Sequence, residues 1–277
     1  GVARYTAAFN NDLPTAPLET EDSRTKLLLN TNSALQDFEI GRMASAPTYA
    51  GDTTVVRRGY KFDGSGHIST SAPFSPGTDD FTIEAWVNIP SNTGTLEAIV
   101  CSSNYNQSGN NGGWLLAADF RSSGNDVVFY HSDGNSLSVR YKTANFSFGA
   151  WHHIAVVRES GTLKFYKDGV QIGTSESDSK SYTQNLTEIG RIQENWLYSN
   201  TGLNYFNGDM SDVRLSEEAV YTSTFTPPES LTAGDNTKFL ITGGEADESS
   251  SEHSLTFSGA YPTAKFGDGA YYFDGTG

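Results

Sequence analysis

Apolar and polar residues alternate along much of this chain in short runs separated by turn residues. The clearest alternation runs from Phe81 to Ile89. Strict alternation with a period of two is typical of a β-strand that buries one face. We therefore predict a strand in which one set of side chains lies in the core: Phe81, Ile83, Ala85, Val87 and Ile89. The opposite face would carry Thr82, Glu84, Trp86 and Asn88.

Residues 151–174 predict three consecutive antiparallel strands. Ser160-Gly161 and Asp168-Gly169 separate them, and two-residue hairpin loops need the positive φ that Asp and Gly tolerate. The first of these strands is apolar at every position from Ile154 to Val157, so both of its faces should be covered. A central strand beside a half-solvated hairpin is what a two-layer sandwich requires.

Further apolar runs predict strands, and none predicts a long helix. They are Leu27–Leu29, Ile99–Cys101, Trp114–Ala117, Val127–Tyr130, Leu137–Tyr141 and Met210–Leu215. The 28 Gly, 14 Tyr and 16 Phe also favour strands and turns. No stretch approaches the roughly 18 apolar residues of a membrane helix, so we predict no membrane insertion. Gly1 in place of an initiator Met indicates a processed or excerpted chain.

Charge and cysteine content narrow the possible partners. The formal net charge is −15, and the 18 Lys and Arg residues do not cluster. Such a chain repels phosphates, so we predict no nucleic-acid partner. Cys101 is the single cysteine, which excludes an internal disulfide, and we expect it to be a small buried side chain.

Several motifs occur in the order typical of one known fold family. They are Tyr60–Gly66, Phe81–Val87, Trp151–Ala155, Leu163–Gly169 and Phe206–Leu215. Together they resemble the laminin-G-like, concanavalin-A-like jelly roll. The resemblance implies an all-β fold, a two-layer antiparallel jelly-roll sandwich of the concanavalin-A-like lectin/glucanase type. This fold hosts lectins, glycanases, adhesion modules and structural spacers, so it does not by itself specify a function.

Parts of the N-terminal sequence recur near the C-terminus. Tyr5–Phe9 resembles Tyr221–Phe225, Thr25–Leu29 resembles Thr237–Ile241, and Tyr60–Gly66 resembles Tyr271–Gly277. Matched pieces in one order, roughly 210 residues apart, indicate an internal repeat of about one domain length.

The repeat predicts three regions. Residues 1–23 would be the tail of a preceding repeat and a linker, and residues 24–231 a complete jelly roll. Residues 232–277 would contain a linker and the first strands of a following repeat. Either the chain is an excerpt of a tandem array, or these last strands complete a neighbouring copy.

The pattern of carboxylates and histidines does not point to catalysis. Glucan-cleaving enzymes of this fold present two or three carboxylates on one strand face, and Glu188–Glu194 lacks the middle one. His152 and His153 are adjacent on a predicted strand and should point to opposite faces, so they cannot jointly hold one metal ion. We therefore expect no enzymatic activity.

Two loops have a composition suited to sugars, which stack on aromatic rings and hydrogen-bond to amides. The alternative for both loops is packing onto the sandwich. The candidate carbohydrate-binding residues are Tyr105 and Asn106 in the first loop, and Trp196, Tyr198, Asn200 and Tyr205 in the second.

The family resemblance also implies a calcium site at the sandwich edge, with Asp37, Asp63, Asp209 and Asp212 as candidate ligands. Calcium takes about six to eight oxygen ligands, so two or more of these acids must converge. Asp37 lies in a variant of the family's usual loop. The alternative to calcium binding is a structural role: Asp63 would form a turn with the next residue, and Asp212 would be a solvated residue of its strand.

The function predicted from these features is a non-catalytic structural or adhesive module of an extracellular assembly. Gly1–Phe9 resembles linkers in large repeat proteins of marine bacteriophages, which implies a virion tail, fibre or appendage protein. Its partners would be other copies or repeats of the same protein and a surface polysaccharide. A bacterial surface adhesin or filament subunit is the alternative, and a polysaccharide-cleaving enzyme is a second alternative.

Overall fold

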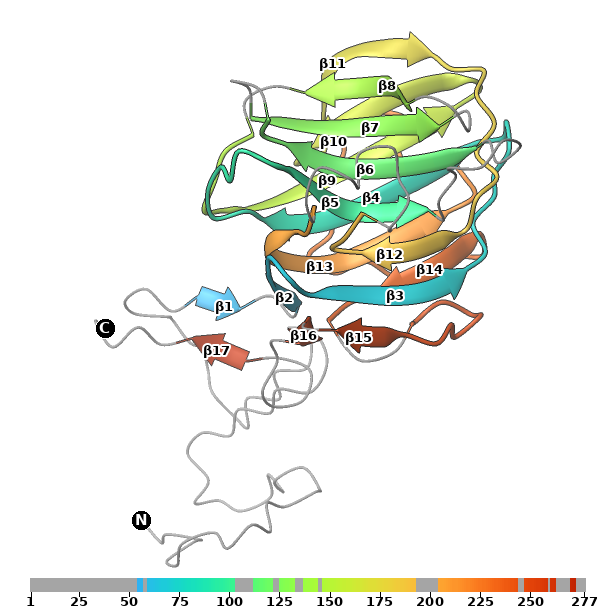
Figure 1. The fold of residues 1–277 in the computed structure, drawn as a ribbon. Coiled ribbons are helices and arrows are strands. Elements are labelled where there is room, and N and C mark those ends of the chain that lie inside the picture. The colour runs from blue at the N-terminus through green and yellow to red at the C-terminus, as the bar shows by residue number, and fades with distance from the viewer. Residues whose placement is uncertain are drawn as a thin grey trace, which may run out of the picture. The chain divides into compact units, whose positions relative to one another are not determined.

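The computed structural model describes residues 54–56, 59–102, 112–121, 125–132, 137–143, 146–192, 204–243, 247–258, 260–262 and 270–272. They belong to two compact units. One unit is continuous, Gly59–Thr263, and the other combines Gly1–Arg58 with Ala264–Gly277. In the second unit, β1 (Thr54–Val56) pairs antiparallel with β17 (Ala270–Tyr272). The larger unit contains the sandwich (Figure 1).

The first sheet of the sandwich has eight strands in the order β11-β10-β9-β4-β13-β2-β16, and β14 also pairs with β13. One edge of β13 pairs with β4, while β2 and β14 share the other edge. The strands are β2 (Tyr60–Asp63), β4 (Phe81–Asn88), β9 (Trp151–Glu159), β10 (Thr162–Lys167), β11 (Val170–Ser177), β13 (Asn207–Ser216), β14 (Thr237–Ile241) and β16 (Tyr261–Pro262).

The second sheet has seven strands in the order β15-β3-β12-β5-β6-β7-β8, and all of its pairings are antiparallel. The strands are β3 (His67–Ala72), β5 (Leu96–Ser102), β6 (Gly113–Asp119), β7 (Asp126–Ser132), β8 (Leu137–Thr143), β12 (Leu186–Ile189) and β15 (Thr256–Ser258). The described residues contain no helix, and hence none that could cross a membrane. The predicted all-β two-layer sandwich is confirmed.

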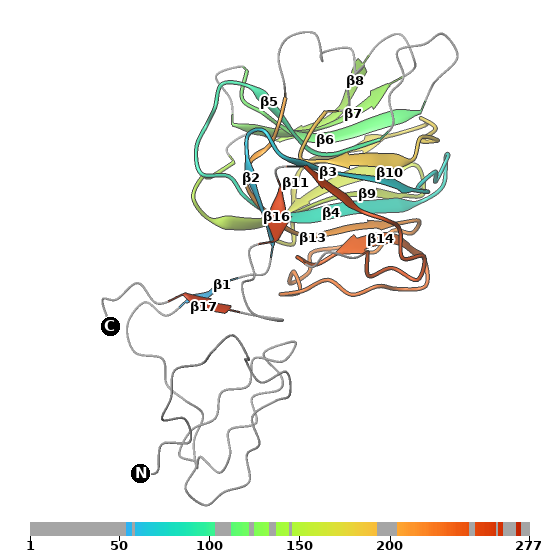
Figure 2. The ribbon, with the colours of Figure 1, turned by 60° about the horizontal axis from the view of Figure 1, so that its bottom comes forward.

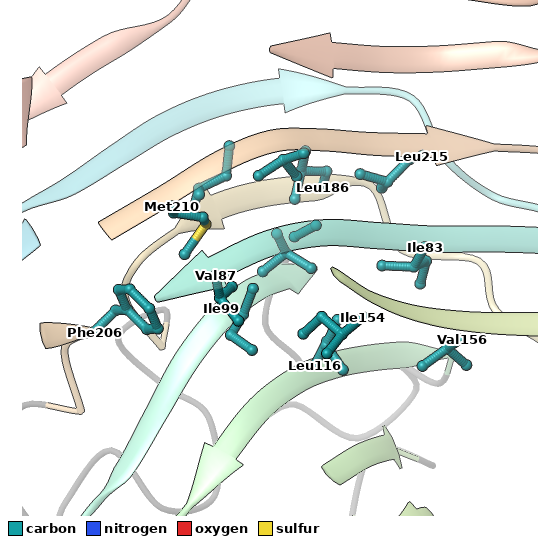
Figure 3. Packing of buried hydrophobic residues seen from close by; sticks show 14 of the residues in the cluster. Ile83, Val87, Ile99, Leu116, Ile154, Val156, Leu186, Phe206, Met210 and Leu215 are labelled. Carbon is teal, nitrogen blue, oxygen red and sulfur yellow. The ribbon is translucent and has the colours of Figure 1, made fainter. Parts of the chain in front are cut away.

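The core lies between the two sheets. Ile83, Val87 and Ile154 reach it from the first sheet, and Ile99 and Leu116 from the second (Figure 3). All five side chains are buried. The alternation predicted for residues 81–89 is confirmed, because its five apolar members all belong to this core.

The predicted hairpins of residues 151–174 are also confirmed. Ser160 and Gly161 have φ of 48° and 72°, and Asp168 and Gly169 have φ of 52° and 77°. Two consecutive positive φ values are what a tight two-residue loop requires. Ile154–Val157 is buried on both faces, since the core covers one face and the chain after β13 covers the other.

That covering segment belongs to a longer stretch, residues 219–262, which we call the wrapping tail. Its first part, the strap (residues 219–232), crosses the outer face of the first sheet. Its second part supplies β14, β15 and β16 to the edges of both sheets (Figure 2). Residues 24–231 were the predicted jelly roll, whereas the compact unit is Gly59–Thr263. The predicted repeat would fix the length of a unit but not the point at which the unit begins.

Candidate functional site

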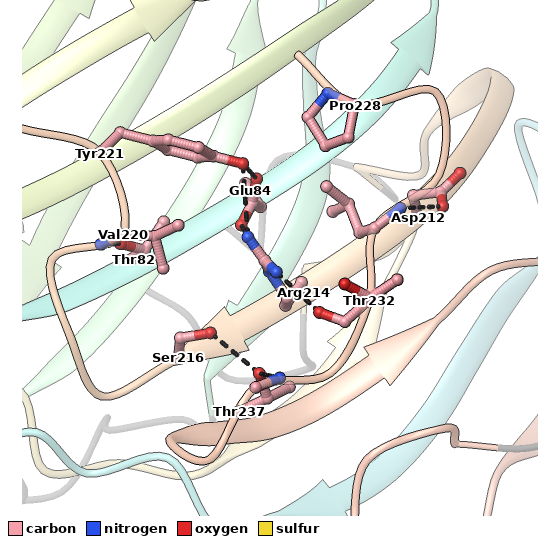
Figure 4. A network of polar contacts seen from close by, with 12 residues as sticks. Thr82, Glu84, Asp212, Arg214, Ser216, Val220, Tyr221, Pro228, Thr232 and Thr237 are labelled. Atoms are coloured by element: carbon pink, nitrogen blue, oxygen red, sulfur yellow. Dashed lines mark hydrogen bonds and ion pairs between the residues drawn. The ribbon is translucent and has the colours of Figure 1, made fainter. Parts of the chain in front are cut away.

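Four polar side chains, which we call the sealed quartet, meet at the outer face of the first sheet: Glu84, His153 and Arg214 from its strands, and Tyr221 from the strap. Figure 4 shows Glu84 between Arg214 and Tyr221. Arg214 Nη2 lies 2.6 Å from Glu84 Oε1, and Arg214 Nε donates to the same oxygen at 2.7 Å. The other oxygen, Oε2, accepts the Tyr221 hydroxyl at 2.9 Å and lies 2.9 Å from His153 Nε2. The strand register explains this convergence, because Arg214 is the Cα partner of Glu84 across β13 and β4.

The strap closes over this quartet. The Tyr221 ring stacks on Phe225 at 3.6 Å, and the Phe225 ring packs edge-on against Tyr166. Backbone bonds hold the strap down: the Val220 N–H donates to Thr82 at 2.9 Å, and the Phe225 N–H donates to the Gly169 carbonyl at 2.9 Å.

The side chains of Glu84 and His153 have no exposed surface. Burial raises the pKa of the Tyr221 phenol, and the neighbouring Glu84 charge raises it further. Both oxygens of Glu84 have protein partners, and the strap covers them. The carboxylate is therefore not accessible to a ligand from solvent.

The two adjacent histidines contact different partners. His152 Nδ1 lies 2.7 Å from Asp168 Oδ2, and its Nε2 lies 2.7 Å from Ser147 Oγ. His153 faces Glu84 on the outer face. Each ring thus ties together neighbouring segments of the first sheet.

Of the four predicted calcium ligands, Asp37 lies outside the described residues. Asp63 accepts the Ser65 hydroxyl at 2.7 Å and the Ser65 N–H at 2.9 Å, and these bonds lower the pKa of Asp63. Asp209 pairs with Lys61 at 3.2 Å. The β2–β13 register places Asp63 and Asp209 on one face of the sheet, at diagonal positions.

Asp212 is used differently, because its Oδ1 accepts the Leu231 N–H and the Ser230 hydroxyl, each at 2.9 Å. It is buried and anchors the end of the strap. Among the described residues, no three potential ligands gather closely enough to hold a metal ion. Since Asp37 is not among them, the calcium site stays a prediction.

Most of the predicted sugar-binding residues, namely Tyr105, Asn106, Trp196, Tyr198 and Asn200, also lie outside the described residues. The roots of their two loops are described. Ser102 at the end of β5 pairs with Leu186 at the start of β12, so the first loop leaves from that end. The second loop follows Ile192, beyond the opposite end of β12. At that end, the Gly190 N–H donates to the carbonyl of Ile99, in the middle of β5, at 3.0 Å. The structure therefore does not bring the two roots together.

Tyr205, the remaining predicted residue, is described and lies at the root of the second loop. It forms a β-bridge with Arg191 and belongs to a second group, the half-buried quartet, with His67 and Glu188. Arg191 Nη2 donates to Glu188 Oε1 at 2.7 Å, while His67 Nε2 lies 3.8 Å from Glu188 Oε2. The His67 and Tyr205 rings are 6.1 Å apart.

This group lies on the outer face of the second sheet. Ile68 points into the core, so its neighbours His67 and Ser69 point outward, and the Ser69 hydroxyl donates to Glu188 at 3.1 Å. The side chains of Glu188 and Arg191 are 7% and 17% exposed. Burial disfavours the Arg191 charge, but hydrogen bonds to Glu188 and Tyr205 outweigh this and raise the pKa of Arg191. A fixed positive charge thus lies beside an aromatic ring and a carboxylate.

The family of the chain follows from a comparison with known protein families. A family model of the concanavalin A-like lectin/glucanases superfamily, Laminin_G_3, matches residues 62–229, which is more than half of the chain. The chain belongs to this superfamily. A search of curated proteins found no match.

Solved structures share the fold at low sequence identity. A heptameric SAP-like pentraxin from Limulus polyphemus is 16% identical with a TM-score of 0.52, and the match covers 74% of this chain and 94% of the pentraxin. A candidate carbohydrate-binding protein from Bacteroides ovatus is 15% identical with a TM-score of 0.51, over 76% of this chain. This chain spans about three fifths of that protein, 62% of its length. These likenesses establish the fold alone.

Of the residues in the two quartets, the sequence predicts only Tyr205 as a binding residue. Glu84 was assigned correctly to the outer face of its strand, and Glu188 was noted only for the carboxylate missing nearby. A signal for the sealed quartet was available, because Glu84 is the single charged residue in the alternating segment from Phe81 to Ile89, and a charge on a covered sheet face requires a partner. The partner itself, Arg214, could not be found without the strand register.

Proposed function

We propose that this chain is a non-catalytic, glycan-binding module of an extracellular assembly, namely a virion tail, fibre or appendage. The observation that carries the proposal is the half-buried quartet at the root of the 193–203 loop. Its charged and phenolic groups are held in place by one another, and they are not completely buried. Sugars are recognised by such a combination of fixed hydrogen-bonding groups and aromatic faces.

The composition of the adjoining loop agrees with this proposal. Trp196, Tyr198 and Asn200 lie a few residues before Tyr205 in sequence, and Ile192 and Asn204 at its base are joined by a backbone hydrogen bond of 3.3 Å. An aromatic loop that begins and ends beside a polar group can offer a stacking ring and hydrogen-bond partners to one saccharide.

The sealed quartet supports the non-catalytic part of the proposal. Hydrolysis by a carboxylate pair requires an acid and a base or nucleophile that both contact the glycosidic bond. Glu84, the carboxylate on the outer face of the central strand β4, is covered by the strap and neutralised by Arg214.

Screening against algal and capsular polysaccharides tests the proposal. We expect one class of polysaccharide to bind, and Trp196→Ala to abolish that binding without lowering the melting temperature. Val170→Ala, a change at an exposed residue of β11, should leave binding intact. Failure to bind any glycan would contradict the binding role, and release of reducing sugar would contradict the non-catalytic role.

The predicted calcium site is tested by repeating the binding and melting measurements with and without calcium. If Asp37, Asp63 and Asp209 share an ion, a chelator should weaken binding or lower the melting temperature, and calcium should restore it. The double variant Asp63→Asn with Asp209→Asn should remove this calcium response. A chain whose stability and binding ignore both reagents would rule the ion out.

A further inference from the structure

Three polar side chains at one end of the first sheet form a chain of close polar contacts that the proposed function does not use. Ser147 Oγ lies 2.7 Å from His152 Nε2, and His152 Nδ1 lies 2.7 Å from Asp168 Oδ2. A hydroxyl, an imidazole and a carboxylate in this order, each within hydrogen-bond reach of the next, are the arrangement that activates a serine as a nucleophile. We call these three residues the terminal triad.

The backbone holds the parts of the terminal triad in position. Just after the serine, the Gly149 N–H donates to the Ile89 carbonyl at 2.9 Å. Asp168 lies in the hairpin turn after β10, where its oxygen Oδ1 accepts the His153 N–H at 3.0 Å. One oxygen therefore orients the carboxylate, and the other is left for His152.

The serine of the triad is accessible, whereas the imidazole behind it is largely shielded from solvent. Ser147 is exposed, and the side chains of His152 and Asp168 are 12% and 44% exposed. A substrate can therefore reach the hydroxyl while the imidazole keeps its place. With the Nδ1 proton donated to Asp168, Nε2 is left to accept the proton of the serine hydroxyl. This is the tautomer that a general base requires.

The surroundings of the serine suit the carbonyl group of an ester. Lys167 Nζ donates to Ser147 Oγ at 3.4 Å, so a positive charge lies beside the place where a negatively charged oxygen would form. The Phe146 ring packs edge-on against the His152 ring at 5.0 Å, and the partly buried Phe148 packs against Phe146. The two rings next to the serine in sequence offer apolar surface to an acyl group.

We propose that the terminal triad hydrolyses carboxylic esters. Ser147 Oγ attacks the carbonyl carbon, and His152 Nε2 takes the hydroxyl proton as the new C–O bond forms. The bond to the alcohol oxygen then breaks, and the alcohol leaves with that proton, so that an acyl-serine remains. Water attacks the acyl-serine with the same imidazole as base, which releases the carboxylic acid and restores the serine. One ester and one water thus give one acid and one alcohol.

This activity goes beyond the proposed function, whose non-catalytic character was argued for glycosidic bonds and for Glu84, and it departs from the sequence-based expectation of no enzymatic activity. Ester hydrolysis cuts no glycosidic bond and releases no reducing sugar, so the two proposals are tested separately. The sequence did not reveal the triad, because Ser147 and Asp168 stand 5 and 16 residues from His152 and meet it only in the folded chain.

Covalent labelling tests whether the serine is activated. A fluorophosphonate probe reacts with serines that a neighbouring base activates, so we expect mass spectrometry of the labelled full chain to place the probe on Ser147. Ser147→Ala should remove the label, whereas Ser91→Ala, a change at another exposed serine, should keep it. His152→Gln should prevent labelling although the serine is still present. A label on other residues, or none at all, would overturn the proposal.

Hydrolysis of 4-nitrophenyl acetate measures the activity itself. We expect Ser147→Ala and His152→Gln each to lower kcat/KM about 100-fold or more, and Ser91→Ala to leave kcat/KM unchanged. An imidazole can hydrolyse this ester without a serine. Activity that survives Ser147→Ala would therefore contradict the proposal.

Asp168 is a positioning residue, since it contacts His152 and not the ester. It has a φ of 52°, which Asn also tolerates, so Asp168→Asn should keep the turn while its amide no longer holds the imidazole in the required tautomer. We expect kcat to fall while KM and the melting temperature change little. A lower melting temperature with unchanged kcat would mean that the contact is structural and would overturn the triad.

Discussion

The two outer faces of the sandwich each carry a glutamate, an arginine, a histidine and a tyrosine, yet they are built differently. In the sealed quartet, Glu84 has no exposed surface and lies under the strap. In the half-buried quartet, Glu188 and Arg191 keep part of their surface in solvent, and Tyr205 adjoins a long loop. Residue types alone therefore do not distinguish a structural site from a binding site.

The solvent access of each quartet determines whether it can bind a ligand. When a buried charge pair loses one partner, the remaining charge has neither a partner nor water to solvate it. The sealed quartet therefore has a structural role, because any ligand would have to break such a pair. A group with remaining solvent access can exchange water for a ligand at much smaller cost. The first face is thus built for stability, and the second face has the solvent access that the proposed glycan recognition needs. Four experiments can break or sharpen this difference.

The largest difference is expected from removing the arginine of each quartet. Arg214→Met should cost about 3–5 kcal/mol of unfolding free energy, because it leaves Glu84 buried without the arginine that neutralises it. Arg191→Met should cost less, about 1–3 kcal/mol, because Glu188 keeps the Ser69 hydroxyl as a hydrogen-bond donor. Urea unfolding followed by tryptophan fluorescence measures both. Equal losses would mean that the strap does not seal the first face.

The strap can be displaced by a single methyl group. A Cβ on Gly169 would lie 1.8 Å from the Phe225 carbonyl oxygen, whereas a Cβ on Gly161 would have its nearest neighbour at 3.7 Å. Both glycines have positive φ, so each alanine variant carries a backbone strain of about 1–2 kcal/mol. We expect Gly169→Ala to cost clearly more than Gly161→Ala and to make the strap sensitive to chymotrypsin. Similar melting temperatures and unchanged cleavage would contradict the close contact.

The two tyrosines should separate binding from stability. Tyr205→Phe removes one hydroxyl from the proposed sugar site, and a loss of about 1.4 kcal/mol corresponds to tenfold weaker binding. Tyr221→Phe should leave glycan affinity unchanged and lower the unfolding free energy instead, because Glu84 loses a buried hydrogen bond. Calorimetric titration and urea unfolding of both variants would show the crossover, and the reverse pattern would exchange the roles of the two faces.

The smallest effect concerns acid stability on the second sheet. Burial of Asp119 opposes its charge, but hydrogen bonds from Arg121 and Tyr130 prevail and lower the pKa of Asp119 below 3.8. A lowered pKa stabilises the folded state above pH 3.8, and this contribution disappears as the pH falls through the folded-state value. Asp119→Asn should therefore destabilise the protein at neutral pH by about 1 kcal/mol or less, because Arg121 is partly exposed.

The difference between wild type and Asp119→Asn should vanish in strong acid. Thermal unfolding at a series of pH values measures it. A difference that stays constant down to the lowest pH would mean that the Asp119 carboxylate is not the group responsible.

Much of the fold could be predicted because its signals are local. The alternation in residues 81–89 and the turns at Ser160-Gly161 and Asp168-Gly169 each depend on a few neighbouring side chains, and all three were confirmed. Cys101 is buried as expected. The unit boundary was harder to predict, since the repeat is compatible with any starting point along its length.

The quartets could not be predicted because they join distant parts of the chain. Glu84 meets Arg214 through the pairing of β4 with β13, and Tyr221 reaches both only because the strap returns over the sheet. Glu188 and His67 meet because β12 pairs with β3. A periodic pattern identifies the face of a strand but does not identify the strand beside it.

The pairing of β16 with β2 has a mechanical consequence. The compact unit begins at Gly59 and ends at Thr263, and Tyr60 is the Cα partner of Pro262 at the end of β16. The two ends therefore leave the sandwich side by side. In the proposed assembly, tension between the two ends would act across this short strand pair and open its hydrogen bonds one after another, instead of shearing many at once. We expect the module to extend at low force, before any covalent link is strained.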